Sequence, residues 1–237
     1  MILGIDAAGK TVSAAVYDEV YDITLSKKMN TSSKGHAETL MPLIDEVLKE
    51  AKLTLDDISV IGVTAGPGSF TGVRIGVSVV KGLAMPKNIL TCGVSSITAA
   101  AYNARKSHDL VLSVMSARNK RFYCSLFDFY GGAGKLWEDS LYGYEEILER
   151  IGTSLKIAVT GEGAEKFYNL VKENKPEISN VFILSENLFT DAENVCRIAA
   201  TKTAIPAESL APFYLGLSQA EQAQLDLERK QAEHAKY

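Results

Sequence analysis

The order of hydrophobic and polar residues in the first half of the chain predicts strands alternating with helices. Short, largely apolar runs bounded by Gly, Asp or Ser predict strands at residues 2–6, 11–17, 20–29, 58–64 and 89–94. Apolar residues at helical spacing predict helices at 35–52, 70–85 and 95–105, and Pro86 ends the second of them. The first three strands are joined by short turns and therefore predict an antiparallel meander.

The second half of the chain repeats this order of elements. Strands are predicted at 110–115, 121–129, 156–160 and 181–184, and helices at 144–151, 163–173 and 192–201. Two lobes of interleaved strands and helices predict an α/β protein with domains at 1–106 and 107–216. Residues 217–237 are typical of a further helix without a strong apolar stripe, which could return to the first lobe.

The composition is that of a soluble globular protein and excludes disordered, collagen-like and coiled-coil chains. The 237 residues are 46% hydrophobic and 23% charged, with 25 Lys+Arg against 29 Asp+Glu. The net charge of -4 hides an acid-free stretch at 58–108, whose cations are Arg74, Lys81, Lys87, Arg105 and Lys106. We interpret this stretch as a buried strand–helix–strand unit with basic residues at its edge.

The cysteines and the start of the chain fit a reducing compartment. Cys92, Cys124 and Cys196 form no C-x-x-C pair, so the sequence indicates neither a disulfide framework nor a zinc site. A membrane span takes about 20 apolar residues, and the apolar runs here are shorter or interrupted. We expect a cytoplasmic protein without a membrane segment.

The glycine-rich segment 66–76 is the most informative motif. It lacks the Gly-Lys pair of a Walker A loop and misses the G-x-G-x-x-G spacing by one residue. A glycine turn that opens a helix leaves backbone N–H groups unpaired, so this turn with Ser69 and Thr71 suits an anion. Capping of the helix by Ser69 or Thr71 explains the same residues equally well.

The glycines of this segment also share one face of the predicted helix, because Gly68, Gly72 and Gly76 recur every four residues. Gly in a helix interior costs about 1 kcal/mol relative to Ala, so a packing reason is expected. Without side chains, this face can approach another backbone closely. That backbone belongs either to the chain's own sheet or to a helix of a partner subunit.

Three segments carry a resemblance to a known family. They are I-L-G-I-D-A-A at 2–8, G-P-G-S-F-T-G-V-R-I-G at 66–76 and P-F-Y-L-G-L-S-Q-A-E at 212–221. Together they resemble the TsaB (YeaZ) family over nearly the whole chain. The resemblance implies the two-lobed fold of actin, sugar kinases and Hsp70 (the ASKHA fold). It also implies a part in making threonylcarbamoyladenosine (t6A) beside the tRNA anticodon.

The family resembled here supplies a platform and not the catalyst. The resemblance implies a scaffold that binds the catalytic paralogue TsaD, with the ATPase TsaE joining the assembly. It also implies that isolated members form homodimers through the same surface, on the helices at 35–52 and 70–85. The expected interface residues are His36, Leu40, Leu43, Val47, Gly68, Phe70, Gly72, Val73, Gly76 and Val80.

Three positions depart from the pattern of the fold and family. The catalytic paralogue holds a metal with an H-x-x-x-H pair, but Leu40 stands four residues after His36, so we expect no metal site and no catalytic residue. Ser116 stands where the pattern has Asp, and Gly216 where it has Arg, which weakens independent ATP turnover. A residual nucleotide or anion site stays open at Asp6, Gly9, Ser69, Thr71, Gly161 and Gly163.

The expected cofactor is none of the chain's own, with ATP or ADP at the interface of the complex as the open alternative. The alternative function is an autonomous ATP-dependent kinase-like enzyme of the same fold, and a metallopeptidase ranks third because no H-E-x-x-H motif occurs. We expect tRNA to bind through the complex. A basic hairpin beside two aromatic residues is the candidate for direct contact: Arg118, Lys120, Arg121, Phe122 and Tyr123.

Overall fold

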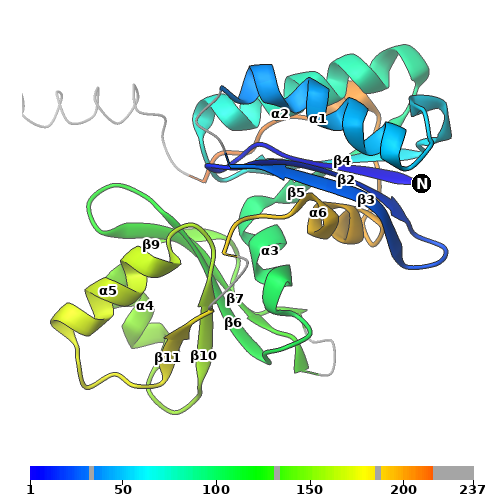
Figure 1. The fold of residues 1–237 in the computed structure, drawn as a ribbon. Helices are drawn as coiled ribbons and strands as arrows, with labels where there is room; N and C mark the ends of the chain where they lie inside the picture. Colours follow the sequence, from blue (N-terminus) through cyan, green and yellow to red (C-terminus); the bar gives the residue numbers. More distant parts are fainter. Residues whose placement is uncertain (32–34, 131–133, 185–187, 216–237) are drawn as a thin grey trace, which may run out of the picture.

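The computed structural model describes residues 1–31, 35–130, 134–184 and 188–215, and within these ranges it forms two mixed sheets (Figure 1). The first sheet has the strand order β3-β2-β1-β4-β5. Its antiparallel part is the expected meander of β1 (Ile2–Asp6), β2 (Val12–Asp18) and β3 (Ile23–Asn30). Two parallel strands extend it beyond β1, namely β4 (Val60–Gly66) and β5 (Leu90–Ser95).

The second sheet repeats this arrangement in the order β11-β10-β6-β7-β8. Its hairpin consists of β6 (Leu110–Ser116) and β7 (Arg121–Asp128), and β7 also pairs with the short strands β8 (Gly134–Lys135) and β9 (Ser140–Gly143). The parallel strands β10 (Ile157–Thr160) and β11 (Val181–Ile183) lie on the other side of β6. In both sheets the central strand is flanked by an antiparallel partner on one side and by parallel strands on the other.

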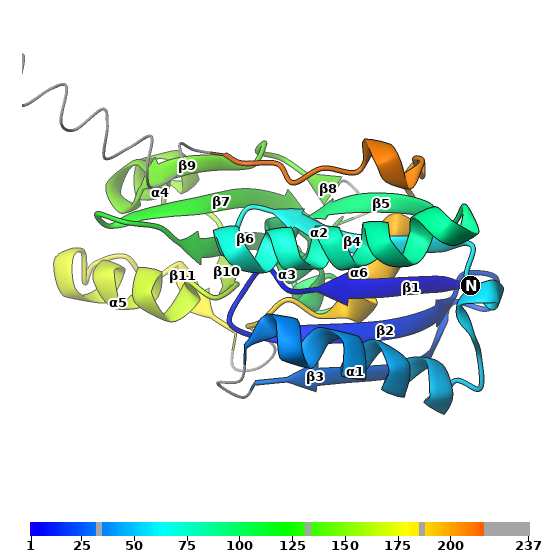
Figure 2. The same ribbon diagram turned by 90° about the horizontal axis from the view of Figure 1, so that it is seen from above.

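The helices and sheets form successive layers, which Figures 1 and 2 show from two directions. Helices α1 (His36–Glu50) and α2 (Phe70–Ala84) cover the outer face of the first sheet, because their apolar stripes pack on it. Helices α4 (Tyr144–Ile151) and α5 (Ala164–Asn174) cover the second sheet in the same way. Helices α3 (Ser96–Ala101) and α6 (Ala192–Ala199) lie between the sheets.

The two middle helices pack on the sheet of the other half of the chain. Helix α6 follows the second sheet, yet Val195 and Cys196 share a core with Ile2 and Ala15 of the first. Helix α3 precedes the second sheet, yet its apolar side packs on β6 and β7. The division of the sequence after residue 106 therefore separates the two sheets, whereas these helices tie the sheets together.

The segment after α6 also returns to the first sheet. Ile205 bridges to Thr91 of β5, and the backbone N–H of Phe213 donates to Ala65 at 2.9 Å. Lys81 of α2 fixes the same segment, since its Nζ lies 3.0 Å from the carbonyl oxygens of both Glu208 and Leu210. Lys81, a cation of the acid-free stretch, thus holds the segment after α6 against α2.

Several boundaries differ from the sequence prediction. The strand expected at 20–29 begins at Ile23, because Val20 and Tyr21 lie exposed in the preceding turn. Strands β8 and β9 were not predicted, and they are only 2 and 4 residues long. The helix expected at 217–237 lies outside the described residues. Over the described ranges, no helix combines the length and apolar character that crossing a membrane demands.

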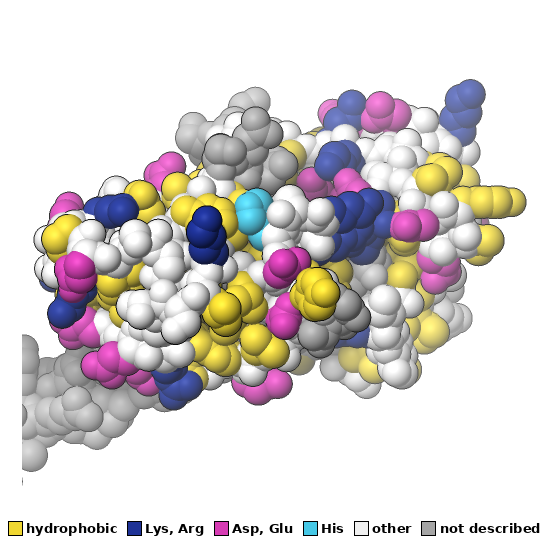
Figure 3. Space-filling view, turned by 90° about the horizontal axis from the view of Figure 1, so that it is seen from below, with side chains coloured by type: hydrophobic (Ala, Val, Ile, Leu, Met, Phe, Trp, Pro, Cys, Tyr) yellow, Lys and Arg dark blue, Asp and Glu magenta, His cyan; other side chains and the backbone are white. Residues whose placement is uncertain are grey.

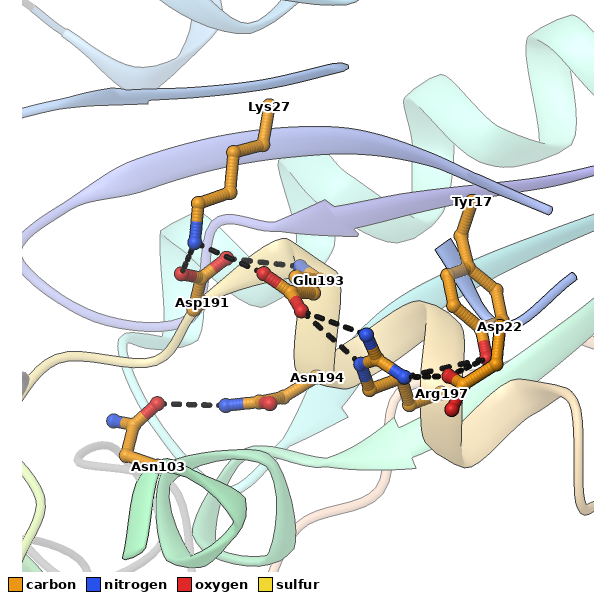
Figure 4. Close-up of polar contacts among 8 residues, drawn as sticks. All are labelled: Tyr17, Asp22, Lys27, Asn103, Asp191, Glu193, Asn194 and Arg197. Carbon is orange, nitrogen blue, oxygen red and sulfur yellow. Dashed lines mark hydrogen bonds and ion pairs between the residues drawn. The ribbon is translucent and has the colours of Figure 1, made fainter. Parts of the chain in front are cut away.

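A polar network fixes α6 against the β2–β3 hairpin (Figure 4). The Arg197 guanidinium bonds Asp22 and Glu193 and lies 4.8 Å from the centre of the Tyr17 ring. Lys27 of β3 bonds Glu193 at 3.0 Å from the other side. Burial alone would raise the pKa of Glu193, but the hydrogen bonds and charges of Lys27 and Arg197 lower it.

Replacing Arg197 by methionine should lower the free energy of unfolding by about 1–2 kcal/mol. The side chain is 12% exposed, so its loss leaves Glu193 with fewer partners, although solvent screens the pair with the 71%-exposed Asp22. Denaturant titration measures the change. The matched control is Lys49→Met, whose ion pair with Asp45 is exposed and should contribute less than about 0.5 kcal/mol. Equal losses for both variants would contradict the role given to Arg197.

Candidate functional site

Asp6, the last residue of β1, is a fully buried carboxyl group at the turn between β1 and β2. Thr64 Oγ1 donates to Asp6 Oδ1 at 2.7 Å, and the backbone N–H of Ala8 donates at 3.2 Å. Oδ2 has no hydrogen-bond partner within the described part of the chain. The pKa of Asp6 is raised to about 7, chiefly by burial and also by the charges of Glu162 and Asp191, against the lowering effect of these two hydrogen bonds.

The loop at 161–163, between β10 and α5, meets this turn from the other lobe, and we call the place where the turn at 6–10 and this loop meet the cleft. The backbone N–H of Lys10 donates to Glu162 Oε1, and a Cβ added to Gly9 would overlap the same carboxylate. His36 Nε2 lies 2.8 Å from the carbonyl oxygen of Gly9 and donates to it. The structure thus brings together four residues of the expected anion site: Asp6, Gly9, Gly161 and Gly163.

The hydroxyl groups of Ser69 and Thr71, expected at this anion site, lie elsewhere. Ser69 is the N-cap of α2, and its Oγ accepts a hydrogen bond from the backbone N–H of Gly72 at 3.2 Å. Thr71 is exposed on the outer side of α2. Of the two interpretations of the glycine segment, helix capping therefore holds for Ser69, and Thr71 is not part of the cleft.

The phosphates of a nucleotide are the group that the fold implies for this cleft. The N–H of Lys10 is already bonded to a carboxylate, and Asp6 has that carboxylate and Asp191 in its electrostatic environment. At the end of β6, where a carboxylate could hold a magnesium ion, the chain has the exposed Ser116. The residues present do not fit a triphosphate.

The glycine face of α2 packs against the chain's own β1–β2 turn. A Cβ on Gly72 would overlap the carbonyl oxygen of Ala7, and one on Gly68 would overlap that of Ala8. A Cβ on Gly76 would lie 3.3 Å from Val63 of β4. Of the two alternatives left by the sequence, close packing within the chain is the one observed.

Most of the expected interface residues lie in the core of the first lobe in the single chain, and the others are at least partly accessible. A side chain buried against its own sheet cannot reach a partner. The buried members are Leu40, Leu43, Val47, Gly72, Val73, Gly76 and Val80. Phe70 is 41% exposed, Gly68 is exposed at the start of α2, and His36 is half-buried at the β1–β2 turn.

The outer side of α2 instead carries an open groove with a volume of about 480 Å³. Arg74 dominates its rim, since its guanidinium lies 3.6 Å from the centre of the Phe70 ring and its Nε donates to the Tyr214 hydroxyl at 2.9 Å. The rings of Phe70 and Tyr214 lie 5.4 Å apart. The described lining residues include no carboxylate: Phe70, Thr71, Arg74, Ile75, Ser78 and Val79.

One of the two aromatic residues beside the basic hairpin is not available for stacking on RNA. Phe122 is completely buried, and Arg121 donates to the carbonyl oxygen of Leu141 at 3.0 Å. On the face seen in Figure 3, carboxylates lie beside the basic side chains, so that face is of mixed charge. Phe122 is therefore corrected from a stacking candidate to a core residue.

Glu162, Ile75, Val79 and Tyr214 are the site residues that sequence reasoning missed. The helical period carried only a weak signal for two of them, because positions 75 and 79 lie three residues after Gly72 and Gly76 and so adjoin the glycine face. Glu162 had a weaker signal in its two flanking glycines. Among the described residues, no group of three His, Cys, Asp or Glu side chains is placed to hold a metal ion.

Comparison with known proteins gives relatives over most of the chain. TsaB, a tRNA threonylcarbamoyladenosine biosynthesis protein of Escherichia coli, is 26% identical over 90% of this chain and 94% of its own. The Bacillus subtilis protein of the same name is 34% identical over 55% of this chain, a match that spans 56% of that protein. The solved structure of YeaZ from Pseudomonas aeruginosa superposes with a TM-score of 0.76 at 23% identity, covering 90% of this chain and 99% of its own.

The repeated sheet order and the cleft between the lobes define a two-lobed ASKHA protein. The family model described as TsaD, tRNA N6-adenosine threonylcarbamoyltransferase, matches residues 29–197. The chain belongs to this family, on the branch of TsaB (YeaZ).

Proposed function

We propose that this chain is the non-catalytic scaffold subunit of the complex that makes t6A in tRNA. The observation that carries the proposal is the groove on α2, an exposed and largely apolar surface on a helix whose other side is fully packed. Aromatic residues and Arg are the residue types that most often anchor protein interfaces, and Phe70, Arg74 and Tyr214 meet at its rim. The names of the TsaB relatives supply the pathway.

The side chains that could act in catalysis support a scaffold because they are buried or already bonded. His36 Nε2 donates a hydrogen bond to the Gly9 carbonyl oxygen, and the Asp6 carboxyl group is buried from solvent. The three thiols are buried, and burial raises the pKa of Cys124 to about 12, far from a reactive thiolate.

The partner that fits the groove is the catalytic paralogue TsaD, with the ATPase TsaE joining the assembly. An apolar, acid-free groove suits a partner that presents apolar side chains and a carboxylate for Arg74. A homodimer through the same surface forms when the chain is alone. On this proposal the complex works in the cytoplasm, tRNA binds through it, and ATP or ADP binds at its interface.

Mixing the purified chain with TsaD should give a heterodimer on size exclusion, and Ser78→Arg should weaken it by at least tenfold. Ser78 is exposed in the groove, so an arginine there adds bulk and a charge that must be desolvated on binding. Titration calorimetry gives the affinities. Ser154→Arg is the matched control, because Ser154 is exposed in the other lobe.

Each outcome of this experiment decides one part of the proposal. If the wild-type chain and TsaD elute separately at micromolar concentrations, the scaffold function is wrong. If Ser78→Arg and Ser154→Arg bind equally well, the function stands but the groove is not the interface. The rival kinase-like enzyme gains support from the meeting of Asp6 with the 161–163 loop. Micromolar binding and turnover of MgATP by the wild-type chain would favour that rival.

A further inference from the structure

Glu162 is held in place by two close approaches of its loop to the second sheet. Gly161 has a φ of +95°, and a Cβ there would overlap the carbonyl oxygen of Val114. A Cβ on Gly163 would lie 2.8 Å from the backbone nitrogen of Ser116, and the Gly163 N–H donates to Val114 at 3.0 Å. Because the residues on both sides are fixed to β6, the backbone of Glu162 has little freedom, and its side chain projects across the cleft to the first lobe.

The Glu162 carboxylate is bound where the β1–β2 turn can bind an anion. It accepts a hydrogen bond from the Lys10 backbone N–H, and it occupies the position that a Cβ atom on Gly9 would take. Backbone N–H groups in a glycine turn are typical donors to phosphate oxygens. A carboxylate oxygen, like a phosphate oxygen, is a negatively charged acceptor for such donors, so the two groups compete for the same N–H.

The surroundings also disfavour a second anion. Asp6 is fully buried behind the turn, with one carboxyl oxygen unpartnered among the described residues. The negative charges of Glu162 and Asp191 already reach this carboxyl group. An added phosphate would face these like charges with the Lys10 N–H already engaged.

We propose that Glu162 is a built-in anion that takes the place of a phosphate group at the β1–β2 turn, links the two lobes across the cleft and excludes phosphate-bearing ligands from it. The cleft is thereby closed without a ligand. The lobes of this chain keep one arrangement in the absence of nucleotide, which is what a subunit acting as a rigid platform requires.

Hydrogen exchange at the Lys10 amide tests the contact itself. Glu162→Ala removes the acceptor, so exchange at Lys10 should become about tenfold faster or more, while Glu162→Gln, which keeps an amide oxygen as acceptor, should lie between. Glu165→Ala is the matched control, because Glu165 is exposed three residues later on α5. Unchanged exchange at Lys10 in Glu162→Ala would overturn the proposal.

Calorimetric titration with pyrophosphate tests the exclusion. The wild-type chain and Glu165→Ala should show no saturable binding at millimolar pyrophosphate. Glu162→Ala should bind it with an affinity at least tenfold above that limit, because the turn amide becomes free. Thermal unfolding of each variant checks that it is folded. Equal pyrophosphate binding by the wild-type chain and Glu162→Ala, or no binding by either, would overturn the exclusion, and neither result bears on the assembly with TsaD.

Discussion

Replacing Gly72 by alanine should destabilise the folded chain by about 3 kcal/mol, the effect of overpacking a site that cannot expand. A single added methyl group would overlap the carbonyl oxygen of Ala7. The turn cannot retreat, because the next carbonyl, of Ala8, accepts the Ser69 N–H at 2.7 Å and Asp6 behind it is fully buried. The new methyl group must therefore push α2 away from the first sheet.

The same substitution at Gly82 should have the opposite sign. Gly82 lies on the same helix, is exposed, and an added Cβ meets nothing within 4 Å among the described residues. There the higher helix propensity of alanine should stabilise the chain by about 1 kcal/mol. Denaturant titration of the two variants gives both free energies of unfolding. If both changes stabilised the chain, the close approach of α2 to the β1–β2 turn would be refuted.

This pair of glycines also marks how far the sequence can predict the packing of α2. Its spacing predicted one helix and one small-residue face, and both are observed. Periodicity identifies which residues share a face but carries no information about what covers that face. The sequence therefore leaves both alternatives open, and the position of the β1–β2 turn is what separates packing on the chain's own turn from packing on a partner subunit.

The burial of most of the expected interface residues has the same origin. The broad apolar stripe of α1, with Leu40, Leu43 and Val47, is what a helix needs to pack on its own sheet. The surfaces of reversible interfaces are in general less apolar than a helix stripe of the core, and the exposed side of α2 likewise combines apolar residues with Arg74 and Ser78. The hydrophobic pattern of a sequence identifies the most apolar face of a helix, and that face is the one buried against the chain's own sheet.

The sequence predicted several residues of the cleft but not the contact between Lys10 and Glu162. The turn after β1 and the loop after β10 come together because the two halves of the chain repeat one topology, which the order of strands and helices already indicated. The contact between Lys10 and Glu162 depends on the angle between the lobes. That angle is set by α3 and α6, two short helices that pack on the sheet of the opposite half, and no local pattern reveals such an exchange.

Replacing Asp6 by asparagine should remove a large part of the pH dependence of stability. The folded-state pKa is raised to about 7 from 3.8, so the folded chain holds a proton that the unfolded chain has released at intermediate pH. Stability from this group is present below the unfolded pKa and falls as pH rises through the window from about 4 to 7. At 1.36 kcal/mol per pKa unit, the fall amounts to about 4 kcal/mol at most.

Asparagine cannot ionise, so the free energy of unfolding of Asp6→Asn should stay nearly level where that of the wild-type chain declines. Denaturant titrations from pH 4.5 to about 7.5 give the two curves, and their difference isolates Asp6 from the other titrating groups. Asp109→Asn, which removes an exposed carboxylate, should run parallel to the wild type. A parallel curve for Asp6→Asn as well would mean that Asp6 is ionised in the folded chain at neutral pH. Water or a cation would then have to reach its unpartnered oxygen, and the cleft would be more open than the contact between Glu162 and Lys10 implies.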